Sequence, residues 1–171
     1  MADETSTFQD RLQSILKRDQ STATSVNRDS EVDGGEESCA AFGFLRGLRE
    51  QANALELRFR NGNSQFFPYS SMGSWKHNPS EGLLLKFTGD LVYVVLIRGS
   101  NLDQRLNENA IDLIRGGLQR HRILWLREMS KDEIKRVGET GPTIDSIEVA
   151  EFDSPAALKD WINKKAPAFA I

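Results

Sequence analysis

"GDLVYVVLIRGSNL", residues 89–102, is the stretch that decides the fold. It holds seven consecutive apolar residues, Leu91 to Ile97, in a chain that is only 39% apolar. Successive side chains of a strand point to opposite faces, so this run places apolar groups on both faces. Both faces must then be covered, and seven residues are too few to span a bilayer. The run therefore predicts a central strand in a layered domain of helices and strands.

The segment after this strand predicts one of its two covers. Residues 100–118 are expected to form a helix capped by Ser100 or Asn101, which folds back onto the sheet. Its apolar stripe is formed by Leu102, Leu106, Ala110, Leu113 and Ile114. The other face of the strand is expected to meet the remaining strands or a helix near residue 45.

The rest of the central section predicts one more helix and four more strands. The helix covers residues 38–53, and the strands are expected at 54–60, 64–72, 83–88 and 122–128. Asn61-Gly62 indicates a hairpin turn, and Pro68 restricts the second strand to an edge of the sheet. The predicted fold class is α+β, with a small, curled, mostly antiparallel sheet of about five strands covered by helices and a C-terminal strand-helix extension.

Four segments are predicted along the chain. Residues 1–18 are expected to form a short amphipathic helix, and residues 19–37 a disordered acidic linker. The α+β core domain follows at 38–128, and residues 129–171 form a helix-strand-helix extension packed on or beside it. Ser130 with Glu133 and Ser154 with Pro155 are expected to begin the two helices of the extension.

The N-terminal helix is a candidate partner-docking element. Its apolar stripe would need a groove on this chain, on a second copy or on another protein. The stripe consists of Phe8, Leu12, Ile15 and Leu16.

The amino-acid composition limits the cellular compartment and the kinds of binding partner that we expect for this protein. A single cysteine, Cys39, cannot form an internal disulfide, and no stretch has the length and apolarity of a membrane span or a signal peptide. We expect a cytoplasmic protein without a membrane partner. Residues 1–39 carry 4 Lys and Arg against 9 Asp and Glu, whereas residues 40–128 carry 12 against 8. This mild basic excess is far below that of a dedicated nucleic-acid binder.

The sequence contains no recognised catalytic constellation. It has no phosphate loop, dinucleotide fingerprint or zinc-protease motif. Its only histidines, His77 and His121, are far apart in sequence and lack a cysteine pair, so neither a metal nor a cofactor is expected. Cys39 is interpreted as a small apolar residue rather than a nucleophile. Non-catalytic binding is therefore favoured over enzymatic activity.

The segment "YSSMGSWKHNP", residues 69–79, is the candidate binding surface together with the basic side of the first hairpin. Aromatic and basic side chains can form the centre of a protein interface, or can stack bases and neutralise phosphates. Alternatively, the aromatic residues belong to the core. The candidate residues are Arg58, Arg60, Tyr69, Trp75, Lys76 and His77.

Three functions remain open, and they are given in order of preference. The first is a non-catalytic interaction module that binds a protein partner or self-associates. The second is a weak RNA or single-stranded DNA binder that uses a basic and aromatic edge, and the third is an enzyme with an unrecognised site.

The middle of the chain resembles a set of short uncharacterised bacterial proteins. The resemblance covers about residues 54–128 and is carried by "LELRFRNGNSQFFPY", "NPSEGLLLKFTGD", "VLIRGSNL" and "ILWLRE". These are turn and core signatures, so the resemblance implies one folded unit of bacterial type and no substrate. The pattern is also similar, at the level of fold alone, to Sm-like and pleckstrin-homology-like small barrels, which implies no function.

Overall fold

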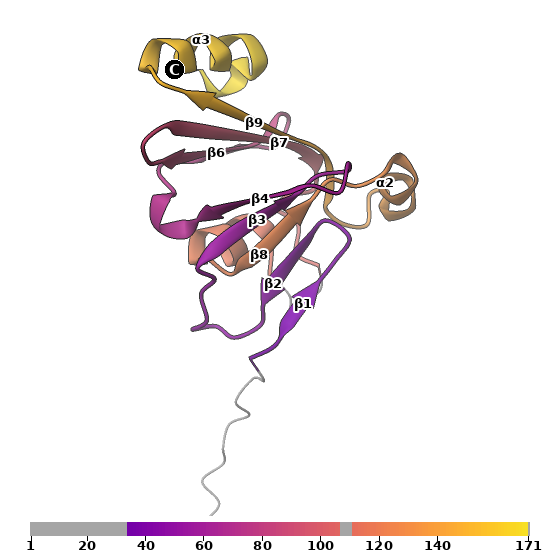
Figure 1. The fold of residues 1–171 in the computed structure, drawn as a ribbon. Helices are drawn as coiled ribbons and strands as arrows, with labels where there is room; N and C mark the ends of the chain where they lie inside the picture. The colour runs from indigo at the N-terminus through magenta and orange to yellow at the C-terminus, as the bar shows by residue number, and fades with distance from the viewer. Residues whose placement is uncertain (1–33, 107–110, 171) are drawn as a thin grey trace, which may run out of the picture. The chain divides into compact units, whose positions relative to one another are not determined.

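A computed structural model describes residues 34–106 and 111–170 (Figure 1). The predicted N-terminal helix and residues 19–33 of the predicted linker lie outside the described residues. The strands are β1 (Glu36–Ser38), β2 (Phe42–Leu45), β3 (Ala54–Arg58), β4 (Ser64–Pro68), β5 (Lys76–Asn78), β6 (Gly82–Thr88), β7 (Val92–Ser100), β8 (Ile123–Arg127) and β9 (Thr143–Phe152). The helices are α2 (Lys131–Val137) and α3 (Pro155–Lys165), with short helical turns η1 (Tyr69–Ser71), η2 (Leu113–Gly117), η3 (Leu118–Arg120) and η4 (Pro167–Phe169).

The α+β class is confirmed, but the strands form two sheets where the sequence predicts one. The five-stranded sheet has the order β1-β2-β8-β3-β4, and the four-stranded sheet has the order β5-β6-β7-β9. Neighbouring strands run antiparallel, except that β3 and β8 run parallel. Figure 1 shows three layers, with α3 above the four-stranded sheet and the five-stranded sheet below it. Two stacked sheets bury more apolar surface between them than one small curled sheet can.

Strand β7 is covered on both faces, as its sequence predicts. It pairs with β6 on one side and β9 on the other. Val95 and Ile97 are 0% exposed and belong to the main core between the sheets. Val94 and Leu96, on the opposite face, pack in a second apolar cluster with residues of α3 and η4.

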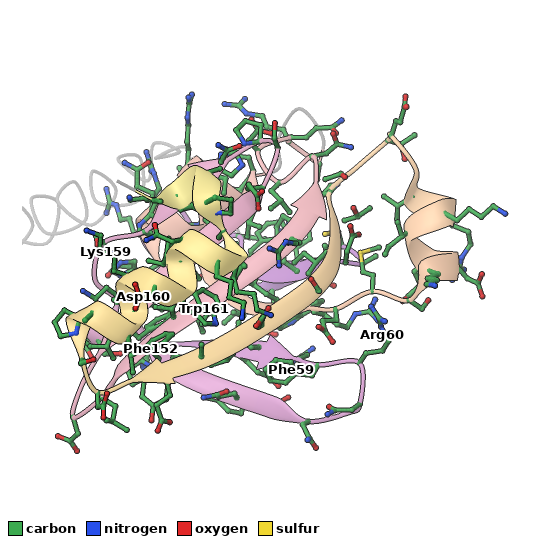
Figure 2. All side chains as sticks on the ribbon, turned by 90° about the horizontal axis from the view of Figure 1, so that it is seen from above. Phe59, Arg60, Phe152, Lys159, Asp160 and Trp161 are labelled. Carbon is green, nitrogen blue, oxygen red and sulfur yellow. The ribbon has the colours of Figure 1, made fainter. Side chains whose placement is uncertain are left out.

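The element that packs on the outer face of β7 differs from the predicted one. It is α3, near the end of the chain, and not the segment that follows β7 (Figure 2). Trp161 of α3 meets Phe152 of β9 edge-on, with ring centroids 5.8 Å apart.

The helix predicted at 100–118 is wrong for the described residues. Residues 101–106 form turns, and only the short turns η2 and η3 follow the undescribed residues 107–110. Asn101 has a left-handed φ of 58°, so it turns the chain at the end of β7 instead of capping a helix. The Asp112 carboxylate accepts backbone hydrogen bonds from Arg115 and Gly116 and starts η2 there. Three residues of the predicted apolar stripe fill the core instead, because Leu102, Leu113 and Ile114 are buried there.

The helix predicted at 38–53 is also wrong, because this segment holds the end of β1, the turn after it, strand β2 and then an irregular stretch over 46–53. Phe42 and Phe44 point into the core, and Gly43 points out. A Cβ atom on Gly43 would lie 2.2 Å from Nε1 of Trp125, so the ring occupies the space that a side chain would need. Glu36 and Glu37, at the end of the predicted linker, belong to β1.

The other predicted elements form where their signals lie. Strands β3, β6 and β8 match the predicted ranges closely, β9 is the strand expected in the C-terminal extension, and Ser130 and Glu133 form the predicted capping box of α2. Strand β4 is the outer strand of its sheet, and Pro68 ends it. Strand β9 pairs with β7 along its length, so the C-terminal extension contributes a strand to the four-stranded sheet.

No helix of the described residues has both the length and the apolar composition that a membrane crossing requires.

Candidate functional site

The outer face of the five-stranded sheet is the candidate site. Leu55, Leu57 and Leu126 are 0% exposed and point into the core, so their strand neighbours point outward. The two α-helices of the described residues pack against β9, and neither covers this face. We call it the open face and define it by the outward residues Gly43, Glu56, Arg58, Phe66 and Trp125, which lie on adjacent strands.

Trp125 is the centre of the open face. Gly43 lies directly opposite it on β2, and the absence of a side chain there lets the indole ring lie over the neighbouring strand. On the other side, the guanidinium carbon of Arg58 lies 4.4 Å from the ring centroid, which is a cation–π contact. The ring is therefore held in place by two strands, and it remains half-buried.

Phe66 extends the apolar surface to the edge of the sheet. It lies opposite Glu56 on β4 and is 63% exposed. Only one other large hydrophobic side chain of the described residues is as exposed, namely Leu48 at 71%, and it belongs to a different surface. Neither described α-helix covers this ring, so Phe66 adds an exposed aromatic group to the half-buried Trp125 on the same face.

The cations beside the open face are already paired within the chain. Arg58 donates from Nε to Oε2 of Glu56 at 2.9 Å, and its Nη2 lies 2.7 Å from the same oxygen. The Ser64 hydroxyl donates to the other Glu56 oxygen at 2.7 Å. The hydrogen bond from Arg58 lowers the pKa of the Glu56 carboxyl below its ordinary value. The charges of this pair cancel on the surface.

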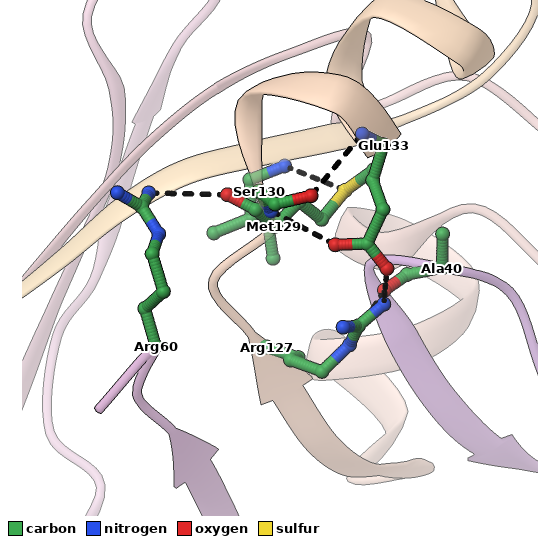
Figure 3. Close-up of polar contacts among 7 residues, drawn as sticks. Ala40, Arg60, Arg127, Met129, Ser130 and Glu133 are labelled. Carbon is green, nitrogen blue, oxygen red and sulfur yellow. Dashed lines mark hydrogen bonds and ion pairs between the residues drawn. The ribbon is translucent and has the colours of Figure 1, made fainter. Parts of the chain in front are cut away.

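A second pair lies at the end of β8 that faces α2 (Figure 3). Nη2 of Arg127 donates to Glu133 at 2.9 Å and to the carbonyl of Ala40 at 2.8 Å. The backbone N–H of Ser130 is the largest influence on Glu133, and Arg127 is the next. Together they lower the pKa of that carboxyl to about 2. Arg127 therefore holds α2 against β8 and the turn between β1 and β2.

Arg60 has a structural role. Its Nη2 donates to the carbonyl of Met129 at 3.1 Å (Figure 3) and to the carbonyl of Asp145 at 2.8 Å. Its backbone N–H donates to Glu128 Oε2 at 2.8 Å. These bonds tie the end of β3 to the chain before α2 and to β9. Arg60 is predicted as a binding residue; its Nη2 is bonded to the protein itself, and the residue remains exposed.

The four other candidates do not form one surface. Tyr69 is 4% exposed, donates its hydroxyl to the Ile123 carbonyl at 2.8 Å and stacks on His121, and burial raises its pKa. Trp75 packs against the main core. Lys76 donates to the Phe169 carbonyl at 2.9 Å. His77 lines a pocket at another place on the molecule.

The apolar residues of the candidate docking helix, Phe8, Leu12, Ile15 and Leu16, lie outside the described residues.

Comparisons with protein-family models, curated proteins and solved structures return no match. The open face is thus interpreted from its geometry alone. Within residues 34–106 and 111–170, no group of three or more His, Cys, Asp or Glu side chains is arranged to hold a metal ion.

Sequence reasoning did not single out Trp125 and Phe66. In "RILWLRE", simple alternation places Trp125 on the same face as Ile123. A bulge at Leu124 changes the register, because Gly43 pairs with Trp125 whereas Phe44 pairs with Ile123. Phe66 follows the alternation of β4, and the glutamate and arginines on the outward side of β3 could have identified its face.

Proposed function

We propose that this chain is a non-catalytic interaction module that binds a protein partner through the open face. The observation that carries the proposal is Trp125, held between Gly43 and Arg58 on a sheet face that neither described α-helix covers, with the exposed Phe66 nearby. Tryptophan and arginine are enriched among the residues that dominate protein interfaces. The single cysteine remains consistent with the expected cytoplasmic location, which forms part of the proposal.

The geometry lowers the cost of association at this surface. A side chain that is already fixed loses little rotamer entropy when a partner covers it. Trp125 is fixed by contacts from two neighbouring strands, and the backbone of Phe66 belongs to a paired strand. Covering a mostly exposed phenylalanine contributes about 1–2 kcal/mol, since full burial of such a side chain contributes about 1.5–3 kcal/mol.

The ion pairs favour a protein partner over a nucleic acid. A phosphate on the open face would compete with Glu56 for Arg58, and one near α2 would compete with Glu133 for Arg127. Nucleic-acid affinity comes largely from cations that neutralise phosphates, and these two are neutralised already. A protein surface with apolar groups and a few hydrogen-bonding groups can use the aromatic residues without breaking either pair.

Co-purification with matched variants tests the proposal. Phe66→Ser removes the exposed ring of the open face, and Leu48→Ser removes a similarly exposed side chain elsewhere. We expect partner recovery from native cells to fall about tenfold or more with Phe66→Ser and to stay unchanged with Leu48→Ser and after nuclease treatment. Equal recovery with both variants, or a partner that nuclease removes, would contradict the proposal.

A further inference from the structure

A second surface, separate from the open face, concentrates positive charge around a cavity of about 620 Å³. Side chains from well-separated parts of the chain line it. Four arginines are included, at positions 105, 115, 120 and 122, together with His77 of β5. We call this cavity the arginine pocket. It shares no lining residue with the open face.

Arg122 is built into the pocket and is 3% exposed. Its Nε donates to the carbonyl of Leu45 at 3.0 Å, and its Nη2 donates to the carbonyls of Leu45 and Arg46, each at 2.7 Å. Its hydrogen-bond partners are carbonyl groups, which fix the guanidinium, and the nearby Glu50 carboxylate offsets part of its charge. Burial lowers the pKa of Arg122, the charge of Arg120 lowers it further, and Glu50 opposes this.

The acidic groups of the lining do not balance the arginines. Among the described residues of the lining, Asp103 and Asp112 are the acidic ones, against four arginines, so the formal charge of this part of the lining is positive even with a neutral histidine. Both oxygens of Asp112 accept backbone hydrogen bonds, from Arg115 at 2.6 Å and from Gly116 at 3.3 Å. In the described residues, no ion pair involves Arg115 or Arg120.

The lining also has an apolar part, formed by Leu48, Ile111 and Ile114. Leu48 is 71% exposed and fills no part of the core, and its place in the wall of this cavity gives the exposed side chain a role. Ligand pockets have volumes of about 300–1,000 Å³ and combine apolar walls with a few charged groups that orient the ligand. The arginine pocket has this size and this combination.

We propose that the arginine pocket binds a small organic phosphate, with the phosphate held by the arginines and the organic part against Leu48. Guanidinium groups bind phosphate through paired, charge-assisted hydrogen bonds. A small ligand is favoured over a polynucleotide because the lining, as far as its residues are described, includes no phenylalanine, tyrosine or tryptophan on which bases could stack. This site is independent of the protein-binding function proposed for the open face, so either proposal can fail alone.

Calorimetry with the full chain tests this site with adenosine 5′-monophosphate and inorganic pyrophosphate as probes. The test variant is the double substitution Arg115→Gln with Arg120→Gln, since both side chains are exposed. The matched control is Lys135→Gln with Arg136→Gln, which removes the same charge from α2, outside the pocket. Melting temperatures of all three proteins establish that each is folded.

We expect the unaltered chain to bind both probes, the double variant to bind them about tenfold more weakly, and the control to bind within twofold of the unaltered chain. Absence of binding at millimolar probe, or an equal loss in the control, overturns the proposal. Citrate that binds as tightly as the phosphates would show a general anion site and overturn the choice of phosphate. If a single-stranded oligonucleotide binds with a steep salt dependence while the small probes do not bind, the proposal of a small ligand is overturned in favour of a nucleic acid.

Discussion

The double cover of β7 makes Val94 a sensitive test of the layered fold. Val94 is 1% exposed and lies in the apolar cluster formed between the four-stranded sheet and α3. Val94→Ala removes two methyl groups, each contributing about 0.8 kcal/mol, and leaves a small cavity. We expect the free energy of unfolding to fall by about 2 kcal/mol.

Val94→Asp is a stronger form of the same perturbation. A carboxylate would replace the valine among apolar side chains of α3 and η4, and burying an unpaired charge costs several kcal/mol. Small domains have a total stability of about 5–15 kcal/mol, so most of the folded state should be lost. The alanine variant keeps the test quantitative when the aspartate variant does not fold.

Urea unfolding of the alanine variant gives the measurement, with Val92→Ala as the control. Val92 lies on the same strand and the same face, but it is only half-buried and does not belong to this cluster, so Val92→Ala should cost less than about 1 kcal/mol. The urea dependence should be equal for all variants, because the surface exposed on unfolding is unchanged. Surface substitutions change the free energy of unfolding by about 0.5 kcal/mol or less. If Val94→Ala changed it by no more than this, the packing of α3 over Val94 would be refuted.

Three further predictions follow from single contacts. Gly43→Ala should lower the melting temperature and change the tryptophan fluorescence, because its Cβ would lie 2.2 Å from Nε1 of Trp125; unaltered fluorescence would contradict this packing. Tyr69→Phe removes the hydrogen bond to Ile123 and should cost about 1 kcal/mol in urea unfolding, whereas no change would mean that the bond contributes nothing. The pKa of Glu133 is lowered from 4.5 to about 2, so the contribution of its carboxylate to stability is complete above pH 4.5 and is lost as the pH falls toward 2. The variant Glu133→Gln should lack this part of the pH dependence of stability. Identical pH profiles of stability for the two proteins would contradict this prediction.

The strands were predictable where the local signal and the tertiary packing agree. The apolar run of β7, the Asn-Gly turn after β3 and the serine caps of α2 and α3 each specify their own structure. Short-range periodicity and side-chain hydrogen bonds determine these features, and both can be read from neighbouring residues.

Two segments were mispredicted as helices because their apolar spacing fits more than one structure. Around Phe42 and Phe44, the spacing suited a helical face, but Gly43 is needed under Trp125, which lies 82 positions later in the chain. After β7, the apolar residues fill the core from turns, with Asp112 holding the backbone. Long-range packing decided both cases, and no local pattern contains that information.

The candidate site was predictable only in part. Arg58 lies on the open face as a cation beside an aromatic ring, but its aromatic partner is Trp125 and not a residue of 69–79. Arg60 is directed at backbone carbonyls, which sequence cannot show. The arginine pocket gathers side chains from distant segments, so only the folded chain brings them together.

Site-specific photo-cross-linking tests the central claim most directly. A photoreactive phenylalanine derivative at Phe66 reports on the open face in native cells, and the same group at Arg136, exposed on α2, serves as the control. The proposed function predicts a protein adduct, with another protein or a second copy of this chain, that forms from position 66, is absent from position 136 and resists nuclease. Adducts that are equal at both positions, or an adduct at position 66 that nuclease destroys, would contradict it.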